Sequence, residues 1–142
     1  MRNDIMKIIT ENKVCALATV SGGAPHCSLM SYAAGEECRE LYMATLQDTR
    51  KYRNLVANPQ VSLLIDTRDS DAKGRTRALT ITGVFQDAGS EKKQAQIRDA
   101  LIARHPDLKD FFNNPGARVM VIKVAAVQLL DGVTDAYFES VS

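Results

Sequence analysis

The residues best suited to chemistry lie together in one short segment, TLQDTRKYR, from Thr45 to Arg53. A strand pattern ends here and a helix pattern begins, so Arg50, Lys51 and Arg53 crowd the first turn or so of the expected helix. The positive end of the helix dipole disfavours cations at that place. An anion resolves the conflict, because free backbone N–H groups, the hydroxyls of Thr45 and Thr49, and the side chains of Arg50 and Lys51 together suit a phosphate.

A second interpretation of the same segment needs no ligand. Asp48 can cap the helix, and the neighbouring cations are then simply solvated. Short basic runs of this kind are common in sequences that bind no anion. On the residues alone, the phosphate site and the solvated helix start are equally good interpretations.

Other side chains with chemical potential are scattered. His26 suits either a proton relay or a partly buried strand position, whereas His105 precedes a proline at a helix end, where its charge is favourable. The segment from Lys73 to Arg77 is a second basic cluster, expected to be a solvated loop or a cover for an anion. Three cysteines without a CxxC pair, and the absence of HExxH, GxGxxG and phosphate-loop motifs, favour neither a zinc site nor hydrolase or nucleotide-triphosphate chemistry.

Hydrophobic periodicity predicts six strands and several helices around these residues. The expected helices cover residues 3–12, 48–58, 90–104 and 108–112, and the expected strands cover 14–20, 25–33, 40–45, 61–66, 77–86 and 117–131. Gly83 inside the fifth strand is typical of a bulge. Hairpin-connected strands with helices at the margins favour an antiparallel barrel in an α+β fold dominated by β, and they disfavour a doubly wound sheet.

Length and composition predict a single domain over residues 1–142, because 45% hydrophobic residues are enough for one packed core. The balance of 18 basic and 17 acidic residues lacks the excess expected of a nucleic-acid binder. No stretch approaches the roughly 18 apolar residues that suggest a membrane helix. The start, MRNDIMKIITENK, does not resemble a signal peptide. We therefore expect a cytoplasmic protein with no nucleic-acid or membrane partner.

The segment ALATVSGGAPHCSLMSYAAGEECRELYMATLQDTRKYRNLVANPQVSLLID, residues 16–66, resembles the flavin-binding half of the pyridoxamine 5′-phosphate oxidase-like family, the FMN-binding split barrels. The features that carry the resemblance are the strand LATVS, Pro25 at the opening of the second strand, LYMAT followed by the TRK triplet, and the return NPQVSLL. The strands at residues 79–83 and 117–130 also fit. The resemblance implies a six-stranded antiparallel split β-barrel with Greek-key connections and peripheral helices.

The resemblance also implies a homodimer in which each FMN lies in a groove between the subunits. Carried over by position, it places one group of residues along the ribityl chain and ring of FMN and a second group at the phosphate. The first group is Ser28, Leu29, Met30 and Ala44, and the second is Thr45, Thr49, Arg50 and Lys51. For Leu29, Met30 and Ala44, barrel core is the alternative role. The resemblance identifies no catalytic side chain, since a flavin itself transfers the electrons or hydride.

The departures from the family pattern concern the substrate. Ala33 and Ala78 stand where pyridoxamine-phosphate oxidases carry a ring-contacting lysine and a glutamine, and residues 131–142 lack their arginine and histidine motif. This favours an FMN-dependent oxidoreductase that acts on another, unidentified small molecule or electron donor.

Two alternatives stay open. One is a flavin-binding electron carrier or sensor without turnover. The other is a relative that binds a deazaflavin or haem, and haem needs His26 or His105 as an axial ligand. The pair Tyr137 and Phe138 either covers the partner's flavin or packs a C-terminal tail.

Overall fold

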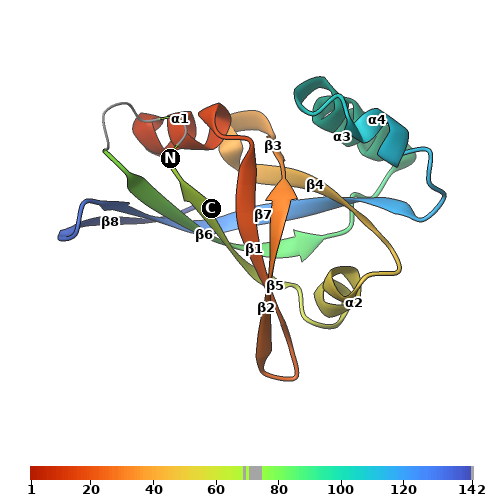
Figure 1. Ribbon diagram of the computed structural model, residues 1–142, viewed down its shortest axis with the longest axis horizontal. Helices are drawn as coiled ribbons and strands as arrows, with labels where there is room; N and C mark the ends of the chain where they lie inside the picture. The colour runs from red at the N-terminus through yellow and green to blue at the C-terminus, as the bar shows by residue number, and fades with distance from the viewer. Residues whose placement is uncertain (69, 71–74, 142) are drawn as a thin grey trace.

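A curled antiparallel sheet forms the centre of the protein, and helices line its margins (Figure 1). The structure is a computed structural model that describes residues 1–68, 70 and 75–141. In chain order, the elements are α1 (Asn3–Glu11), β1 (Val14–Ser21), β2 (Ala24–Ser31), β3 (Ala33–Ala34), the 3₁₀ helix η1 (Glu36–Cys38), β4 (Glu40–Leu46), α2 (Arg50–Ala57), β5 (Gln60–Asp66), β6 (Arg77–Gln86), α3 (Glu91–Arg104), α4 (Leu108–Phe111), β7 (Ala117–Asp131) and β8 (Asp135–Ser140). The predicted α+β class dominated by β is confirmed.

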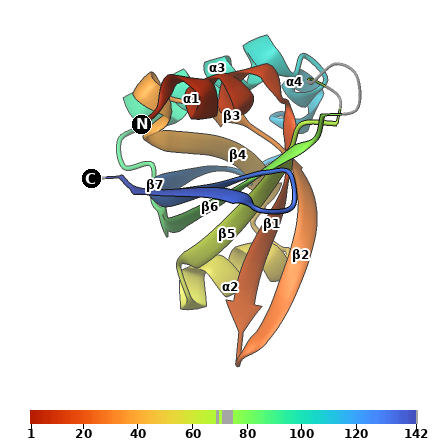
Figure 2. The same cartoon turned by 90° about the vertical axis from the view of Figure 1, so that its left-hand side faces the viewer.

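The strand order explains why the sheet curls. Its order is β2-β1-β5-β6-β7-β4-β3, and β8 pairs with the part of β7 that β4 leaves uncovered. Only Tyr32 separates β2 from β3 in the chain, so the first and last strands of this order meet. The sheet therefore forms a half-barrel (Figure 2). Its gap lies between β2 and β4, which are neighbours but do not pair in the described part of the chain.

Over the residues that the structure describes, the sheet has eight strands, so the prediction of six is wrong. The expected strand at residues 25–33 is broken at Tyr32, whose N–H donates to the Lys13 carbonyl (3.1 Å) and whose buried hydroxyl donates to the Ile9 carbonyl (2.6 Å). The other additional strand, β8, follows a turn at residues 132–134 and pairs with β7. Because β3 has two residues and β8 is largely exposed, hydrophobic periodicity reveals neither.

The main core lies on the inner face of the half-barrel, where alternate strand residues point. Leu17, Leu63 and Ile81 are at most 1% exposed there, and α1 closes one end of this core. A second cluster lies on the other face of β4 and β7, under α3, and consists of Ala33, Ala88, Ile97, Leu101 and Val121. In both views α2 lies at the end of the sheet away from α1, α3 and α4 (Figures 1 and 2).

The helices are short relative to a lipid bilayer. The longest, α3, has 14 residues, whereas a membrane-spanning helix needs about 20. Over the described ranges, no helix is long and apolar enough to cross a membrane.

Gly83 marks the predicted irregularity in β6. Thr82 pairs with Ala126 but Gly83 pairs with Val124, so Ala125 is an extra residue on β7. The bulge lies where β7 changes partner on its other edge, from β4 to β8. It therefore helps to set the register of the strand that supports the candidate site.

Candidate functional site

The TRK segment begins α2, and Thr49 is its N-cap. The Thr49 hydroxyl accepts a hydrogen bond from the Tyr52 N–H (3.2 Å) and donates to the Leu46 carbonyl (2.9 Å). Asp48 is not the cap, because its side chain is 99% exposed and pairs with Arg53 at 3.1 Å. The solvated-helix interpretation is therefore wrong about the cap, and the cations remain to be explained.

Two side chains reach the helix start from neighbouring strands of the half-barrel. Thr45, on β4, is 4% exposed, and its hydroxyl lies 3.4 Å from that of Thr49. Met30, on β2, is 6% exposed, and its Sδ lies 2.8 Å from Lys51 Nζ. Since Thr49 already donates to Leu46, Thr45 is the donor in this contact, and the contact is long enough for the Thr45 hydroxyl to exchange it for a ligand. Residues from β2, β4 and α2 thus converge at the gap of the half-barrel.

The charges at this place are unbalanced. Arg53 pairs with Asp48, but within the described ranges neither Arg50 nor Lys51 has a carboxylate partner. The contact of Lys51 is a thioether sulfur, which is a weak acceptor. Burial lowers the pKa of Lys51, because desolvation disfavours its charged form. A bound anion would give Arg50 and Lys51 a charged partner and would offset the desolvation of Lys51.

The remaining predicted residues divide between faces of the sheet. Ser28 shares the inner face of β2 with Met30 and is half-buried. Leu29 lies on the opposite face and is 77% exposed. Ala44 is on the other side of β4 from Thr45, packed against the cluster under α3. The structure therefore brings together Met30, Thr45, Thr49 and Lys51, but not the side chains of Leu29 and Ala44.

Sequence reasoning missed a buried polar pair beside this site. Asn54 is 6% exposed, and its Nδ2 donates to Thr19 Oγ1 on β1 at 3.4 Å, where Thr19 is 1% exposed. Asn54 lies one helical turn after Lys51, on the same side of α2. That spacing is the signal that could have found it, whereas its partner depends on the tertiary fold.

The two histidines have different environments. His105 is the C-cap of α3, at the helix end as expected, but it is only 8% exposed, and its Nε2 lies 2.7 Å from the Tyr32 carbonyl oxygen. His26 is half-buried on the inner face of β2, the same face as Ser28. Of the two, His26 is the histidine beside the candidate site.

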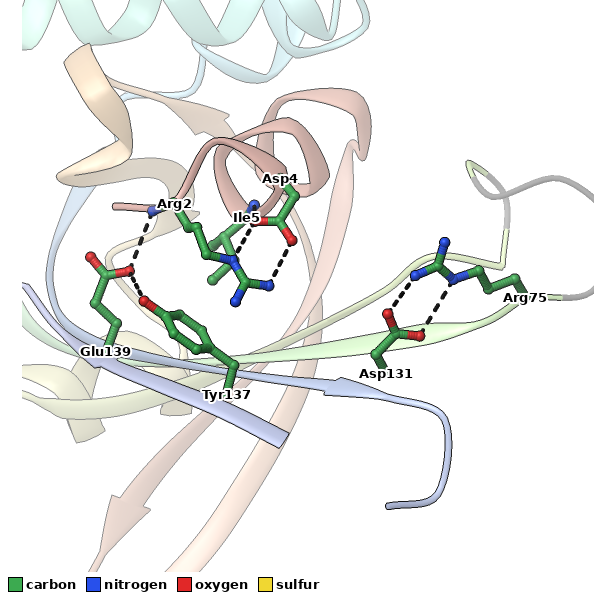
Figure 3. Close-up of polar contacts among 7 residues, drawn as sticks. All are labelled: Arg2, Asp4, Ile5, Arg75, Asp131, Tyr137 and Glu139. Atoms are coloured by element: carbon green, nitrogen blue, oxygen red, sulfur yellow. Dashed lines mark hydrogen bonds and ion pairs between the residues drawn. The ribbon is translucent and has the colours of Figure 1, made fainter. Parts of the chain in front are cut away.

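The C-terminal aromatic pair lies in β8, where Figure 3 shows Tyr137 beside Arg2 and Glu139. The Arg2 guanidinium lies 3.9 Å from the centre of the Tyr137 ring, and the Tyr137 hydroxyl donates to Glu139 Oε1 at 3.0 Å. Phe138 points the other way and is 65% exposed. The pair is part of a strand fixed to the start of α1, and Tyr137 packs this C-terminal segment against the core. The contact with a partner's flavin stays a prediction.

The second basic cluster is described only in part, since Lys73 and Gly74 lie outside the described residues. Arg75 pairs with Asp131 at the end of β7, with Nη2 at 2.5 Å from Oδ2 (Figure 3). Arg77 begins β6, and its N–H donates to Thr67 Oγ1 at 2.7 Å. The described end of the cluster is therefore tied to the sheet.

The comparison with protein families agrees with this arrangement. The model of the family described as pyridoxamine 5′-phosphate oxidase matches residues 1–131. The chain belongs to this family. The resemblance stated from the TRK segment and its flanking strands is thus confirmed for the pyridoxamine 5′-phosphate oxidase family. A comparison with curated proteins finds no match.

Solved structures share the fold of this family member at low sequence identity. A heme binding protein from Mycobacterium smegmatis superposes with a TM-score of 0.83 and 19% identity, over 99% of this chain and 59% of that one. A FAD-binding protein from Mesorhizobium loti superposes with a TM-score of 0.74 and 20% identity, over 89% of each chain. A putative pyridoxamine 5′-phosphate oxidase from Listeria innocua superposes with a TM-score of 0.72 and 22% identity, over 90% of this chain and 96% of that one. Proteins with this fold are thus described as binding different cofactors, heme in one case and FAD in another.

Proposed function

We propose that this protein is a cytoplasmic, FMN-binding oxidoreductase of a small molecule, with Thr45, Arg50 and Lys51 as donors to the FMN phosphate. The observation that carries the proposal is that Arg50 and Lys51 lack a carboxylate partner in the described ranges, while Lys51 rests on a sulfur atom. A phosphate supplies the oxygen acceptors that these cations lack. Thr49 acts mainly by capping α2, which keeps the first N–H groups of the helix directed at the same place.

The other inner-face residues position the rest of the cofactor in this proposal. Ser28 and Met30 line the β2 side of the gap, and a flavin held there supplies electron or hydride transfer. Leu29 and Ala44, whose side chains point elsewhere, contribute through their backbone or through a partner subunit. The protein's own part is to bind, to orient and to exclude water.

The substrate proposed is not a vitamin B6 phosphate. Ala33 is 4% exposed and packs in the cluster under α3, so this position offers neither charge nor hydrogen bonds to a flavin ring. Ala78, on β6, likewise has a methyl group where pyridoxamine-phosphate oxidases carry the amide of a glutamine. The small molecule or electron donor is therefore a different one.

We expect the visible spectrum to test the proposal directly. Cofactor-free protein mixed with FMN and passed through gel filtration should retain flavin absorbance at about one FMN per chain. Repeated oxidation of a nicotinamide nucleotide per bound flavin would identify an enzyme, whereas one stoichiometric reduction would identify an electron carrier or sensor. A colourless protein indifferent to FMN contradicts the proposal.

Haem and deazaflavin are the alternatives in the same experiment. A deazaflavin also carries a phosphate, so binding of deazaflavin but not FMN would keep the site and change the cofactor. Haem would give a Soret band that His26→Ala abolishes, since His105 is already engaged with Tyr32. No loss of the band in that variant would point to a ligand from elsewhere.

A homodimer is part of the proposal, and an apolar row on the outer face supports it. Leu29 and Leu64 flank Ala16 in register across β2, β1 and β5, and they are 77% and 45% exposed. Val14, also 45% exposed, extends the row along β1. Exposed apolar patches of this kind mark interaction sites, and this one is on the strand that also carries Met30.

We expect Leu29→Asp to convert a wild-type dimer into a monomer, because a dimer would have to desolvate the new carboxylate. Size-exclusion chromatography with light scattering at micromolar concentration measures the mass. Val133→Asp is the matched control, since Val133 is 99% exposed at the β7–β8 turn, away from the row. A monomeric wild type, or a dimeric Leu29→Asp, contradicts the assignment.

A further inference from the structure

The contact between Lys51 and Met30 has an unusual chemistry for an ammonium group. Lys51 Nζ lies 2.8 Å from Met30 Sδ, and in the described ranges Lys51 has no carboxylate partner. A thioether is a weak hydrogen-bond acceptor, so it holds the ammonium without neutralising it. The sulfur thus occupies a position that an oxygen acceptor would fill better.

We propose that Met30 is an oxidation site whose sulfoxide captures Lys51 and so weakens phosphate binding. Hydrogen peroxide is the oxidant: its O–O bond breaks, one oxygen atom bonds to the sulfur, and the other leaves as water. The sulfur loses two electrons and the peroxide gains them. A thioether sulfur has two lone pairs, so one can accept from Lys51 while the other attacks the peroxide oxygen.

The sulfoxide would act on the site in two ways. Oxidation converts an apolar side chain into a polar one. The sulfoxide oxygen accepts a strong hydrogen bond from the Lys51 ammonium, which holds the Lys51 side chain against β2. The partial negative charge of the same oxygen repels phosphate oxygens. Because Met30 is 6% exposed and faces the gap, the added oxygen also takes up room there.

Met30 differs from the other described methionines in its contact with Lys51. It belongs to the same main core as Met43 and Met120, which are fully buried, whereas Met1 and Met6 belong to the start of the chain and to α1, at the opposite end from α2. Lys51 contacts none of them in the described structure. Oxidation of these residues should therefore leave the Lys51 contact intact.

The inference rests on the proposed function for its FMN readout and for a local peroxide source, since a reduced flavin that reacts with oxygen releases hydrogen peroxide. The experiment measures FMN affinity before and after peroxide, in the wild type and in Met30→Leu, with peptide mass spectrometry to locate the added oxygen. We expect the affinity of the wild type to fall by about tenfold, the effect of about one charge-assisted hydrogen bond. In Met30→Leu, the ratio of FMN affinity before and after peroxide should stay near one. Methionine sulfoxide reductase should restore the FMN affinity of the oxidised wild type.

A second readout needs no cofactor. Acylation of Lys51 by an amine-reactive reagent should become slower after peroxide in the wild type, and not in Met30→Leu. If untreated protein fails to bind FMN, the proposed function falls while the labelling still tests the Met30 inference. Met30 that stays unoxidised while Met6 is oxidised, or an oxidised Met30 with unchanged Lys51 labelling, would overturn it.

Discussion

Replacing Arg50 and Lys51 together by alanine is expected to weaken FMN binding by about a hundredfold or more. Each hydrogen bond from a charged group is worth about 1.5–3 kcal/mol, and 1.4 kcal/mol is a factor of ten. Both side chains lack a carboxylate partner in the described ranges, so their removal leaves no buried anion behind. Quenching of flavin fluorescence during titration gives the dissociation constant.

The matched control is Arg53→Ala, on the same helix. Arg53 pairs with Asp48 and is exposed, so its loss should change FMN affinity by no more than about twofold, in line with the small worth of surface ion pairs. Riboflavin, which has no phosphate, separates the phosphate from the ring. The double variant should lose the preference for FMN over riboflavin that the wild type is expected to show. Unchanged FMN affinity in the double variant would make the phosphate assignment wrong.

The local part of this site could be predicted because it depends on neighbours in the chain. The conflict between a helix dipole and the cations Arg50 and Lys51 is visible in one segment, and the structure keeps both at the start of α2. The choice of cap could not be made in the same way. Asp48 and Thr49 are both good N-cap residues, and the extended φ of −124° at Thr49 decides between them.

The rest of the site depends on contacts across the fold. Which of Met30 and Leu29 faces inward follows from the register with β1, and a shift of one residue would exchange their faces. The pairs Met30 with Lys51 and Thr19 with Asn54 join residues more than twenty positions apart. No local pattern contains that information.

Gly83→Ala is expected to destabilise the fold by about 3 kcal/mol, at the upper end of the cost of overpacking. A Cβ at this position would lie 2.7 Å from the Lys123 carbonyl oxygen and 2.8 Å from Ile122 Cγ2. The first of these atoms is backbone, held in the β6–β7 pairing, so the strand itself must shift. The midpoint of urea unfolding, with the slope unchanged, measures the effect.

Gly116→Ala is the control for the general effect of a glycine replacement, since a Cβ there meets only the Asn114 side-chain oxygen, at 3.3 Å. We expect it to cost less than about 1 kcal/mol, as do most replacements away from the core. The contrast also bears on the site. The bulge beside Gly83 lies where β7 leaves β4, the strand that carries Thr45. A shift of β7 should therefore lower FMN affinity in the fraction of Gly83→Ala that remains folded, and equal stability of the two variants would show that this close backbone approach does not constrain the fold.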